Sequence, residues 1–240
     1  MRRFFAENLD LEGNTVLLTG DNARHIRNVL RMKSGDEVLL INGGGDECLA
    51  RILSCREDGV ELEIVERQVC EADPDIEVTL FQCLPKQGKM EVIIQKCVEL
   101  GVSRIVPTVS RRCVVKIEGK DGKIVRWNKV SQEAAKQCGR ARVPEVTRPI
   151  ELPQADLTGF DLVLIAYENE SETTLKSILS TNRSVRSIAV IIGPEGGFEP
   201  GEVSKVIDAG GTAVSLGRRI LRTETAGMAV LAQIMYELEQ

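Results

Sequence analysis

The chain has 240 residues, 42% of them apolar and 28% charged, a composition typical of a globular protein with one large or two modest domains. No apolar run approaches the length of a membrane span, and the N-terminal MRRFF lacks the apolar stretch of a signal peptide, so we expect a cytoplasmic protein without a membrane partner. The net charge is −5, and seven cysteines with no CxxC pair and a single histidine argue against a zinc site or a disulfide framework.

Residues 1–72 form the first predicted domain, a small β-rich unit. Strands are expected over 16–18, 36–42 and 48–53, and Val60, Leu62 and Ile64 alternate with acidic residues as in a half-buried strand. Three consecutive glycines, 43–45, lie between two predicted strands and are followed by no helix. They therefore indicate a hairpin turn rather than a phosphate-binding loop.

One helix is predicted inside this unit, with Asp21 as its N-terminal cap and Ala23, Ile26 and Leu30 on its apolar face. Its other face presents arginines, and further arginines begin the chain. The five are Arg2, Arg3, Arg24, Arg27 and Arg31. They favour phosphate contact, because a guanidinium group pairs with phosphate oxygens through two parallel hydrogen bonds. A merely solvated helix face is the alternative.

Residues 73–240 form the second predicted domain, in which strands and helices alternate. Strands are expected over 77–84, 104–107, 161–167 and 187–192, and helices over 89–100, 123–138, 200–210 and from Thr223 onward, with Thr223 as the cap. Such alternation predicts an α/β sheet. The last helix bears an apolar stripe that fits either the core of its own domain or a subunit interface.

The segment 85–148 is strongly basic. It contains 15 Lys and Arg residues against 6 Asp and Glu, a net charge of +9 that leaves −14 on the rest of the chain. A basic block inside an acidic protein indicates RNA or another polyanion as a partner. A solvated face of a helical hairpin would produce the same pattern.

Two glycine-containing loops follow apolar, strand-like runs. They are Ile191–Gly201, IIGPEGGFEPG, and Leu216–Ala226, LGRRILRTETA. Neither is GxGxxG, and the first lacks the Lys-Ser/Thr of a Walker A loop, which argues against dinucleotide or ATP binding. Glycines let a ligand approach the backbone closely, so the loops predict one pocket at the carboxyl ends of neighbouring strands, suited to an adenosine-type ligand.

These loops resemble the two cofactor loops of SPOUT-type, trefoil-knotted RNA methyltransferases, and the rest of the chain is similar to the bacterial 16S ribosomal RNA uracil-N3 methyltransferases within that superfamily. The matching motifs are His25 with Val29–Arg31, Pro85–Lys86, Gln95–Gly101, Arg111–Arg112 and Glu133–Arg140. The resemblance covers essentially the whole chain. It implies an N-terminal PUA-like β-barrel that binds RNA and a C-terminal trefoil-knotted α/β domain that binds S-adenosylmethionine. It also implies a homodimer that acts on the N3 atom of a uridine in 16S ribosomal RNA of the small ribosomal subunit, with no metal required.

The matching motifs place the cofactor against Ile165, Ala166, Ile192, Gly193, Pro194, Glu195, Gly196, Gly197, Leu216, Gly217, Ile220, Leu221, Arg222, Thr223, Thr225 and Ala226. Arg222 is the candidate for contact with uracil or phosphate, and Glu224 is a candidate base or orienting group; a salt bridge at a helix start is the alternative for both. Glu195 is expected to shape its loop, and a valine at Gly196 to fill space that the ligand needs. RNA contacts are expected from Arg2, Arg3, Arg24, Arg27, Arg31, Lys86, Arg111, Arg112, Arg140 and Arg142.

Two other functions fit the same residues. An RNA-binding or ribosome-assembly module with a vestigial pocket would explain the basic segment alone. Another SPOUT methyltransferase, acting on a different base or on a ribose 2′-hydroxyl, would share both loops.

Overall fold

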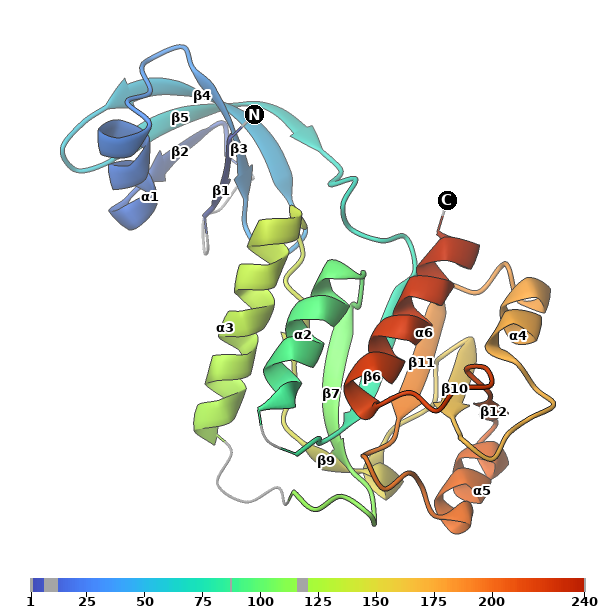
Figure 1. The fold of residues 1–240 in the computed structure, drawn as a ribbon. Helices are drawn as coiled ribbons and strands as arrows, with labels where there is room; N and C mark the ends of the chain where they lie inside the picture. The colour runs from blue at the N-terminus through green and yellow to red at the C-terminus, as the bar shows by residue number, and fades with distance from the viewer. Residues whose placement is uncertain (1, 7–12, 87, 116–120, 240) are drawn as a thin grey trace. The chain divides into compact units, whose positions relative to one another are not determined.

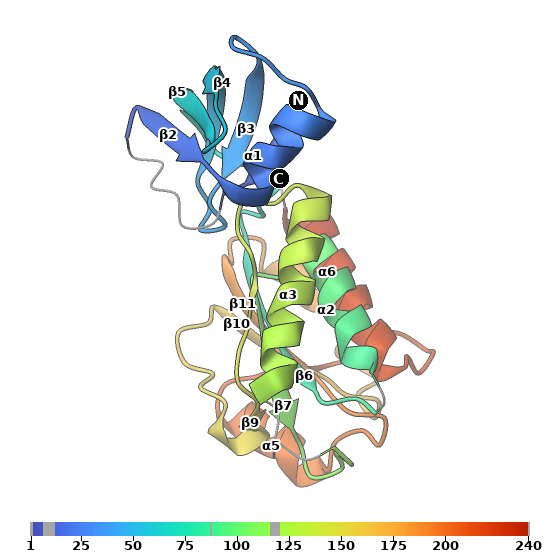
Figure 2. The ribbon, with the colours of Figure 1, turned by 90° about the vertical axis from the view of Figure 1, so that its left-hand side faces the viewer.

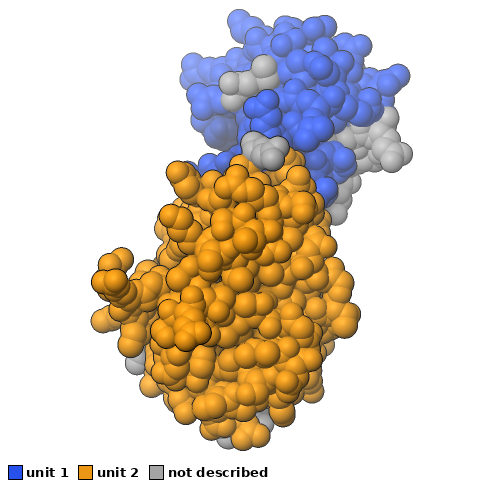
Figure 3. Space-filling model, turned by 90° about the vertical axis from the view of Figure 1, so that its right-hand side faces the viewer, with its two compact units in different colours: residues 1–73, 135–143 blue, residues 74–134, 144–240 orange. Residues whose placement is uncertain are grey.

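The computed structural model describes residues 2–6, 13–86, 88–115 and 121–239. Its contacts divide the chain into two compact units, residues 1–73 with 135–143 and residues 74–134 with 144–240 (Figure 3). Segment 135–143 was predicted as part of the second domain. It belongs to the first unit instead, because its backbone is hydrogen-bonded to residues of that unit. The backbone N–H groups of Ala141 and Arg142 donate to the Asp73 carboxylate at 3.1 and 2.9 Å, and that of Val143 donates to the Gly43 carbonyl at 3.1 Å.

Within its described residues, the first unit contains one five-stranded sheet in the order β1-β3-β4-β5-β2. The strands are β1 (Arg2–Phe5), β2 (Thr15–Leu18), β3 (Glu37–Ile41), β4 (Glu47–Cys55) and β5 (Val60–Gln68). β3 and β4 are antiparallel neighbours, so the hairpin predicted around Gly43–Gly45 is confirmed. β1 was not predicted; it pairs in parallel with β3. Alternate strand residues such as Leu40, Ile52 and Leu62 are fully buried and form the core of this unit.

The predicted helix of this unit is α1 (Gly20–Arg24), continued by a π-helical turn, η1 (His25–Val29). Ala23 and Ile26 are buried, as its apolar spacing predicted. The predicted cap is wrong: Thr19 occupies the N-cap position, and the Asp21 carboxylate instead pairs with Arg24 at 2.5 Å. On the basic face Arg24 and Arg31 are exposed and Arg27 is half-buried.

The second unit has a sheet in which every neighbouring pair of strands is parallel, in the order β12-β10-β11-β6-β7-β8, with β9 also paired to β7. The strands are β6 (Glu77–Cys83), β7 (Arg104–Val109), β8 (Glu145–Val146), β9 (Ile150–Glu151), β10 (Leu162–Ala166), β11 (Ser187–Ile192) and β12 (Thr212–Val214). The prediction of an α/β sheet is confirmed. Parallel strands end at a common edge, which is where loops from β10, β11 and β12 can meet.

Helices cover this sheet. They are α2 (Lys89–Glu99), α3 (Asp121–Cys138), α4 (Leu175–Thr181), α5 (Pro200–Asp208) and α6 (Thr223–Leu238), with a 3₁₀ turn, η2 (Leu152–Gln154). Figures 1 and 2 show α2, α3 and α6 on the same side of the sheet. Gly227 of α6 brings its backbone close to β6 and α2, since a Cβ there would lie 3.5 Å from Leu80 and 3.8 Å from Cys97. Leu231 and Ile234 are fully buried, so the apolar stripe of α6 is core of its own unit.

None of the helices in the described residues combines the length and apolar character needed to cross a membrane.

Candidate functional site

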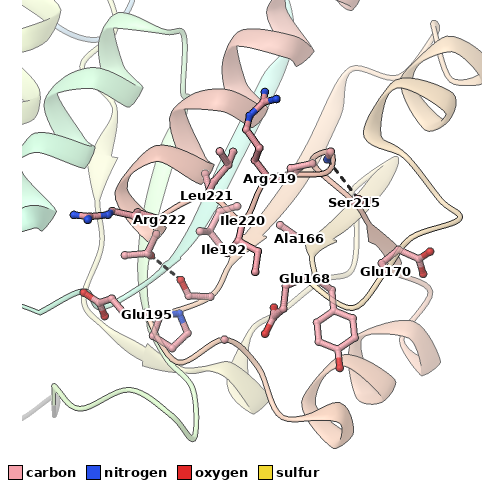
Figure 4. A pocket seen from close by; sticks show the side chains of 18 of the residues that line it. Ala166, Glu168, Glu170, Ile192, Glu195, Ser215, Arg219, Ile220, Leu221 and Arg222 are labelled. Atoms are coloured by element: carbon pink, nitrogen blue, oxygen red, sulfur yellow. Dashed lines mark hydrogen bonds between the residues drawn. The ribbon is translucent and has the colours of Figure 1, made fainter.

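The two glycine-containing loops meet in one pocket of about 900 Å³ at the carboxyl ends of β10, β11 and β12. The loop after β11 contributes Gly193–Gly197, the loop after β12 contributes Ser215–Arg222, and the loop after β10 contributes Tyr167 and Glu168. A volume of this size is within the range of sites that enclose a small organic ligand, roughly 300–1,000 Å³. The predicted meeting of the loops in one pocket is thus present in the structure (Figure 4).

Most of the residues predicted to contact a cofactor line this pocket. They are Ala166, Ile192, Gly193, Pro194, Glu195, Gly196, Gly197, Leu216, Gly217, Ile220, Leu221, Arg222, Thr223 and Ala226. Ile165 and Thr225 do not line it, because Ile165 is fully buried on the other face of β10 and Thr225 is exposed on α6.

The pocket also contains residues that the sequence did not single out. They are Lys89, Tyr167, Glu168, Glu170, Ser171, Thr174, Ser215, Arg218 and Arg219. Most follow β10, a predicted strand whose carboxyl end lies beside those of β11 and β12. The loop after β10 has no glycine motif. These residues could have been predicted only from their position directly after a strand that ends beside the two glycine-containing loops.

Thr223 joins the two loops through its hydroxyl group. That hydroxyl donates to the Gly193 carbonyl at 2.6 Å and accepts a hydrogen bond from Gln82 Nε2 at 2.9 Å, while the residue is only 5% exposed. The predicted capping by Thr223 is wrong, because Arg222 occupies the N-cap position of α6. Thr223 instead ties the first turn of α6 to the end of β11, which fixes one wall of the pocket.

Glycine is required at two of the loop positions by backbone conformation. Gly197 has φ of +66° and Gly217 has φ of +110°, both in the region that side chains rarely adopt. At Gly196 an added Cβ would lie 3.3 Å from the Cβ of Arg112, so a larger side chain there would press against that arginine. The expectation that a valine at Gly196 takes space from the ligand stays a prediction.

Lys89 lies between two carboxylates at the pocket. Its Nζ is 3.5 Å from Glu195 and 3.1 Å from Glu224. Burial acts to raise the pKa of Glu195, but the backbone N–H groups of Glu195 and Lys86 and the Lys89 ammonium hold it below its usual value. The pKa of Glu224 is also lowered, first by its own backbone N–H, against burial, and then by Lys89 and Arg222.

Both carboxylates are therefore ionised near neutral pH and are weak proton acceptors. Glu224 does not line the pocket. It forms a salt bridge with Lys89 at the start of α6, which is the alternative to a role as base. Glu195 accepts from the backbone N–H of Lys86 at 3.0 Å, in keeping with the expected loop-shaping role.

Arg222 lines the pocket wall but makes no hydrogen bond or ion pair through its side chain within the described residues. In Figure 4 its guanidinium group points away from Ile192 and Ala166, toward the outside of the pocket. Arg222 is therefore an exposed cation at the rim of the pocket, close enough to Glu224 to lower the pKa of that carboxyl group.

Three predicted RNA contacts lie close to the pocket loops in the same unit. Lys86, Arg111 and Arg112 are all exposed. The backbone N–H of Arg111 donates to Glu202 at 2.9 Å, and its side chain pairs with Glu199 at 3.2 Å. Arg112 donates to the Gly196 carbonyl at 3.1 Å. The turn with both arginines is thus bonded to the glycine loop and to the start of α5.

In the first unit, Arg2 and Arg31 are exposed and make no side-chain hydrogen bond within the described ranges. Arg24 is exposed beside Asp21, and Arg27 is half-buried and donates to the carbonyl of Arg56.

Three more predicted contacts of the first unit involve segment 135–143. Arg3 donates to the carbonyl of Gly139, and Arg142 is exposed. Arg140 differs from the expectation, because it is 3% exposed and its Nε lies 3.1 Å from the Asp73 carboxylate. Its guanidinium stabilises the chain segment rather than facing a phosphate.

Known proteins are similar to this chain in sequence and in fold. A family model described as RNA methyltransferase domain matches residues 72–235, and one described as RNA methyltransferase PUA domain matches residues 18–65. The chain is 34% identical to Ribosomal RNA small subunit methyltransferase E of Bacillus subtilis, over 100% of this chain and 98% of that protein. It is 33% identical to the Synechocystis protein of the same name, over 94% and 74%. The crystal structure of a Ribosomal RNA small subunit methyltransferase E from Neisseria gonorrhoeae bound to S-adenosyl methionine has a TM-score of 0.80 and 32% identity, over 100% and 98%.

Proposed function

The chain belongs to the ribosomal RNA small subunit methyltransferase E family, and from that premise we propose that it methylates N3 of a specific uridine in 16S ribosomal RNA, with S-adenosylmethionine as the methyl donor. The observation on which the proposal depends most is the pocket formed by the two loops at the carboxyl ends of β10, β11 and β12. The N-terminal unit, which matches the PUA model, would contact the RNA around the target.

The residues present fit S-adenosylmethionine. The pocket offers backbone groups of Gly193–Gly197 and Leu216–Leu221 to a nucleoside, and its open space at Gly217 lets a ligand approach the chain without a Cβ in the way. Glu168 and Glu170 place negative charge beside it, which suits a donor with a sulfonium and an ammonium group. Glu168 makes no hydrogen bond or ion pair with any described residue and is free to accept one from the ligand.

S-adenosylmethionine supplies a methyl group already activated on its sulfonium sulfur. The protein's task is then to hold the donor and uracil in line, and such positioning can lower a barrier by roughly 7–11 kcal/mol. Thr223 holds Gly193 against α6 through its hydroxyl group. Lys89 links the glycine loop to the same helix, because it pairs with Glu195 of the loop and Glu224 of α6. These contacts keep the pocket wall in one arrangement.

Uracil N3 must lose its proton before it attacks the methyl group, and a general base typically contributes about 10²–10⁴-fold. The only histidine of the chain, His25, lies in the other unit, and the pKa values of Glu195 and Glu224 are lowered. In this proposal Glu168 or a water molecule accepts the N3 proton. Arg222 at the rim would stabilise the negative charge that develops on the uracil carbonyl oxygens.

The RNA contacts in this proposal are the predicted cations that are exposed. They are Arg2, Arg3, Arg24, Arg31 and Arg142 in the first unit and Lys86, Arg111 and Arg112 in the second, while Arg27 is half-buried and Arg140 is buried. A paired imide face cannot be methylated, so the target uridine would be unpaired or extruded. Affinity for RNA would then fall steeply as the salt concentration rises.

The experiment that tests the proposal is transfer from labelled S-adenosylmethionine to unmodified small-subunit RNA and to assembled small subunits, followed by nucleoside mass spectrometry. The expected product is N3-methyluridine. A vestigial binding module would transfer no label, and a SPOUT methyltransferase of different specificity would yield another methylated base or a 2′-O-methyl ribose.

The family resemblance extends the proposal to a homodimer, a trefoil knot in the α/β unit and a cytoplasmic location. Exposed apolar residues support a dimer, with Tyr236 of α6 89% exposed and Ile220 of the second loop 87% exposed. Light scattering coupled to size exclusion should return twice the mass of 26.4 kDa. A monomer at micromolar concentration would remove the dimer from the proposal.

A further inference from the structure

Two cysteines lie together in the α/β unit, beside the glycine loop but outside the pocket. Cys83 is the last residue of β6 and is fully buried. Cys113 closes a turn after β7, in which its backbone N–H donates to the Ser110 carbonyl at 3.0 Å. Cys113 is partly exposed and packs against the apolar cluster that contains Cys83. The pair combines a sulfur that solvent can reach with one that it cannot.

The surroundings of Cys113 favour its thiolate. The backbone N–H of Ser110 donates to its Sγ at 3.4 Å, and the Ser110 hydroxyl lies 3.5 Å from the same atom. The Cys83 thiol lowers the pKa of Cys113 to about 6; burial of Cys113 acts in the opposite direction, and Ser110 adds to the lowering. The pKa of Cys83 is raised by the same contact with Cys113 and by burial. These contacts favour the thiolate at the partly exposed Cys113 and the thiol at the buried Cys83, as in a pair of attacking and resolving cysteines.

The same turn is bonded to the glycine loop. Arg112, next to Cys113, donates to the Gly196 carbonyl at 3.1 Å, and the backbone N–H of Arg111 donates to Glu202 on α5 at 2.9 Å. A disulfide brings two sulfurs to about 2.05 Å and holds the Cβ atoms about 3.5–4.5 Å apart. Because Cys113 is next to Arg112, any shift of Cys113 on forming such a bond would also shift the residue that donates to the Gly196 carbonyl.

We propose that Cys113 and Cys83 form an oxidation site for hydrogen peroxide, in which a reversible disulfide weakens the donor pocket through Arg112. The Cys113 thiolate attacks one peroxide oxygen, the O–O bond breaks, and sulfenic acid forms with release of hydroxide. The Cys83 sulfur then attacks the sulfenic sulfur, the S–S bond forms, and the displaced hydroxide leaves as water with the Cys83 proton. Each peroxide takes two electrons from the pair. The effect on the donor pocket rests on the proposed function; the disulfide does not.

The test uses the full-length protein, treated with hydrogen peroxide and mapped by mass spectrometry of non-reduced peptides. We expect a Cys83–Cys113 disulfide that dithiothreitol removes. Cys113→Ser should form none, and Cys83→Ser should accumulate sulfenic acid at Cys113 that dimedone traps. Cys55→Ser is the matched control, because Cys55 is exposed but belongs to the other unit. Peroxide that leaves Cys83 and Cys113 as thiols while Cys55 is oxidised would overturn the site.

Calorimetry with S-adenosylmethionine tests the coupling. Oxidation should weaken binding about tenfold in the wild type, the size expected for loss of one charged hydrogen bond, and dithiothreitol should restore it. Cys113→Ser should keep its affinity in peroxide. A mapped disulfide with unchanged affinity would overturn the coupling through Arg112. If the reduced protein does not bind the donor, the proposed function fails, and the peptide map still decides whether the oxidation site exists.

Discussion

Replacing Thr223 with valine removes the hydroxyl that joins the glycine loop to α6 and changes little else in shape. The Gly193 carbonyl would lose its donor at 2.6 Å, and Gln82 Nε2 would lose its acceptor at 2.9 Å. Gln82 Nε2 keeps a second bond to the Cys83 carbonyl at 3.1 Å, and both Thr223 and Gln82 are buried. The substitution therefore leaves the half-buried Gly193 carbonyl without this donor and the buried Gln82 amide only partly paired.

The expected loss follows from those two groups. An unsatisfied buried polar group costs about 1–3 kcal/mol, and neither group is both buried and wholly unpaired, so Thr223→Val should lower the free energy of unfolding by about 1–3 kcal/mol. For a unit of this size the melting temperature should fall by about 2 °C or more. Affinity for S-adenosylmethionine should fall about tenfold, because the freed loop must be ordered again when the ligand binds.

Thr225→Val is the matched control. It makes the same change two residues along α6, where the side chain is exposed and makes no hydrogen bond within the described residues. Its effect on stability should stay within about 0.5 kcal/mol. Differential scanning calorimetry and titration calorimetry on both variants provide the comparison. If the two variants lose equal stability, the loss comes from the valine side chain and not from the missing hydroxyl. A Thr223→Val protein that melts and binds like the wild type would refute the role given to the hydroxyl.

Three further outcomes can be measured on the same pocket. Gly217→Ala should lower stability by about 1–3 kcal/mol through its φ of +110° alone, since nothing lies within 4 Å of the added Cβ, whereas Gly201→Ala on α5 should not; chemical denaturation compares them. Arg222→Ala should keep the wild-type melting temperature but lose most methyl transfer, and unchanged turnover would remove Arg222 from the reaction. The pKa values of the two carboxylates bridged by Lys89 are lowered in the folded protein, so their stabilising effect is fully present above the usual pKa of a glutamate and is lost as the pH falls. Lys89→Gln should therefore lose less stability than the wild type between about pH 6 and pH 3 in pH-dependent melting curves, and parallel curves would contradict the bridge.

Local patterns predicted most of the elements. Alternating apolar residues located β5, the triple glycine located the hairpin between β3 and β4, and buried apolar runs located β10 and β11 within one residue at each end. β1 escaped prediction because its four residues, two of them arginines, show no alternation over enough length. Periodicity also left the apolar stripe of α6 open between core and interface, and only the packing against β6 and α2 assigned it to the core.

Local sequence patterns predicted that two glycine-containing loops follow strands of an α/β sheet and meet in one pocket, because strand ends and glycine conformations are local properties. Which side chains are partners became known only from the fold. Thr223 bonds to Gln82 across 141 positions and Lys89 to Glu224 across 135, and no local pattern relates residues so far apart. For the same reason Arg140 and Arg142, two basic residues in one short segment, differ in role: Asp73 pairs with the buried Arg140 side chain, and that of Arg142 is exposed.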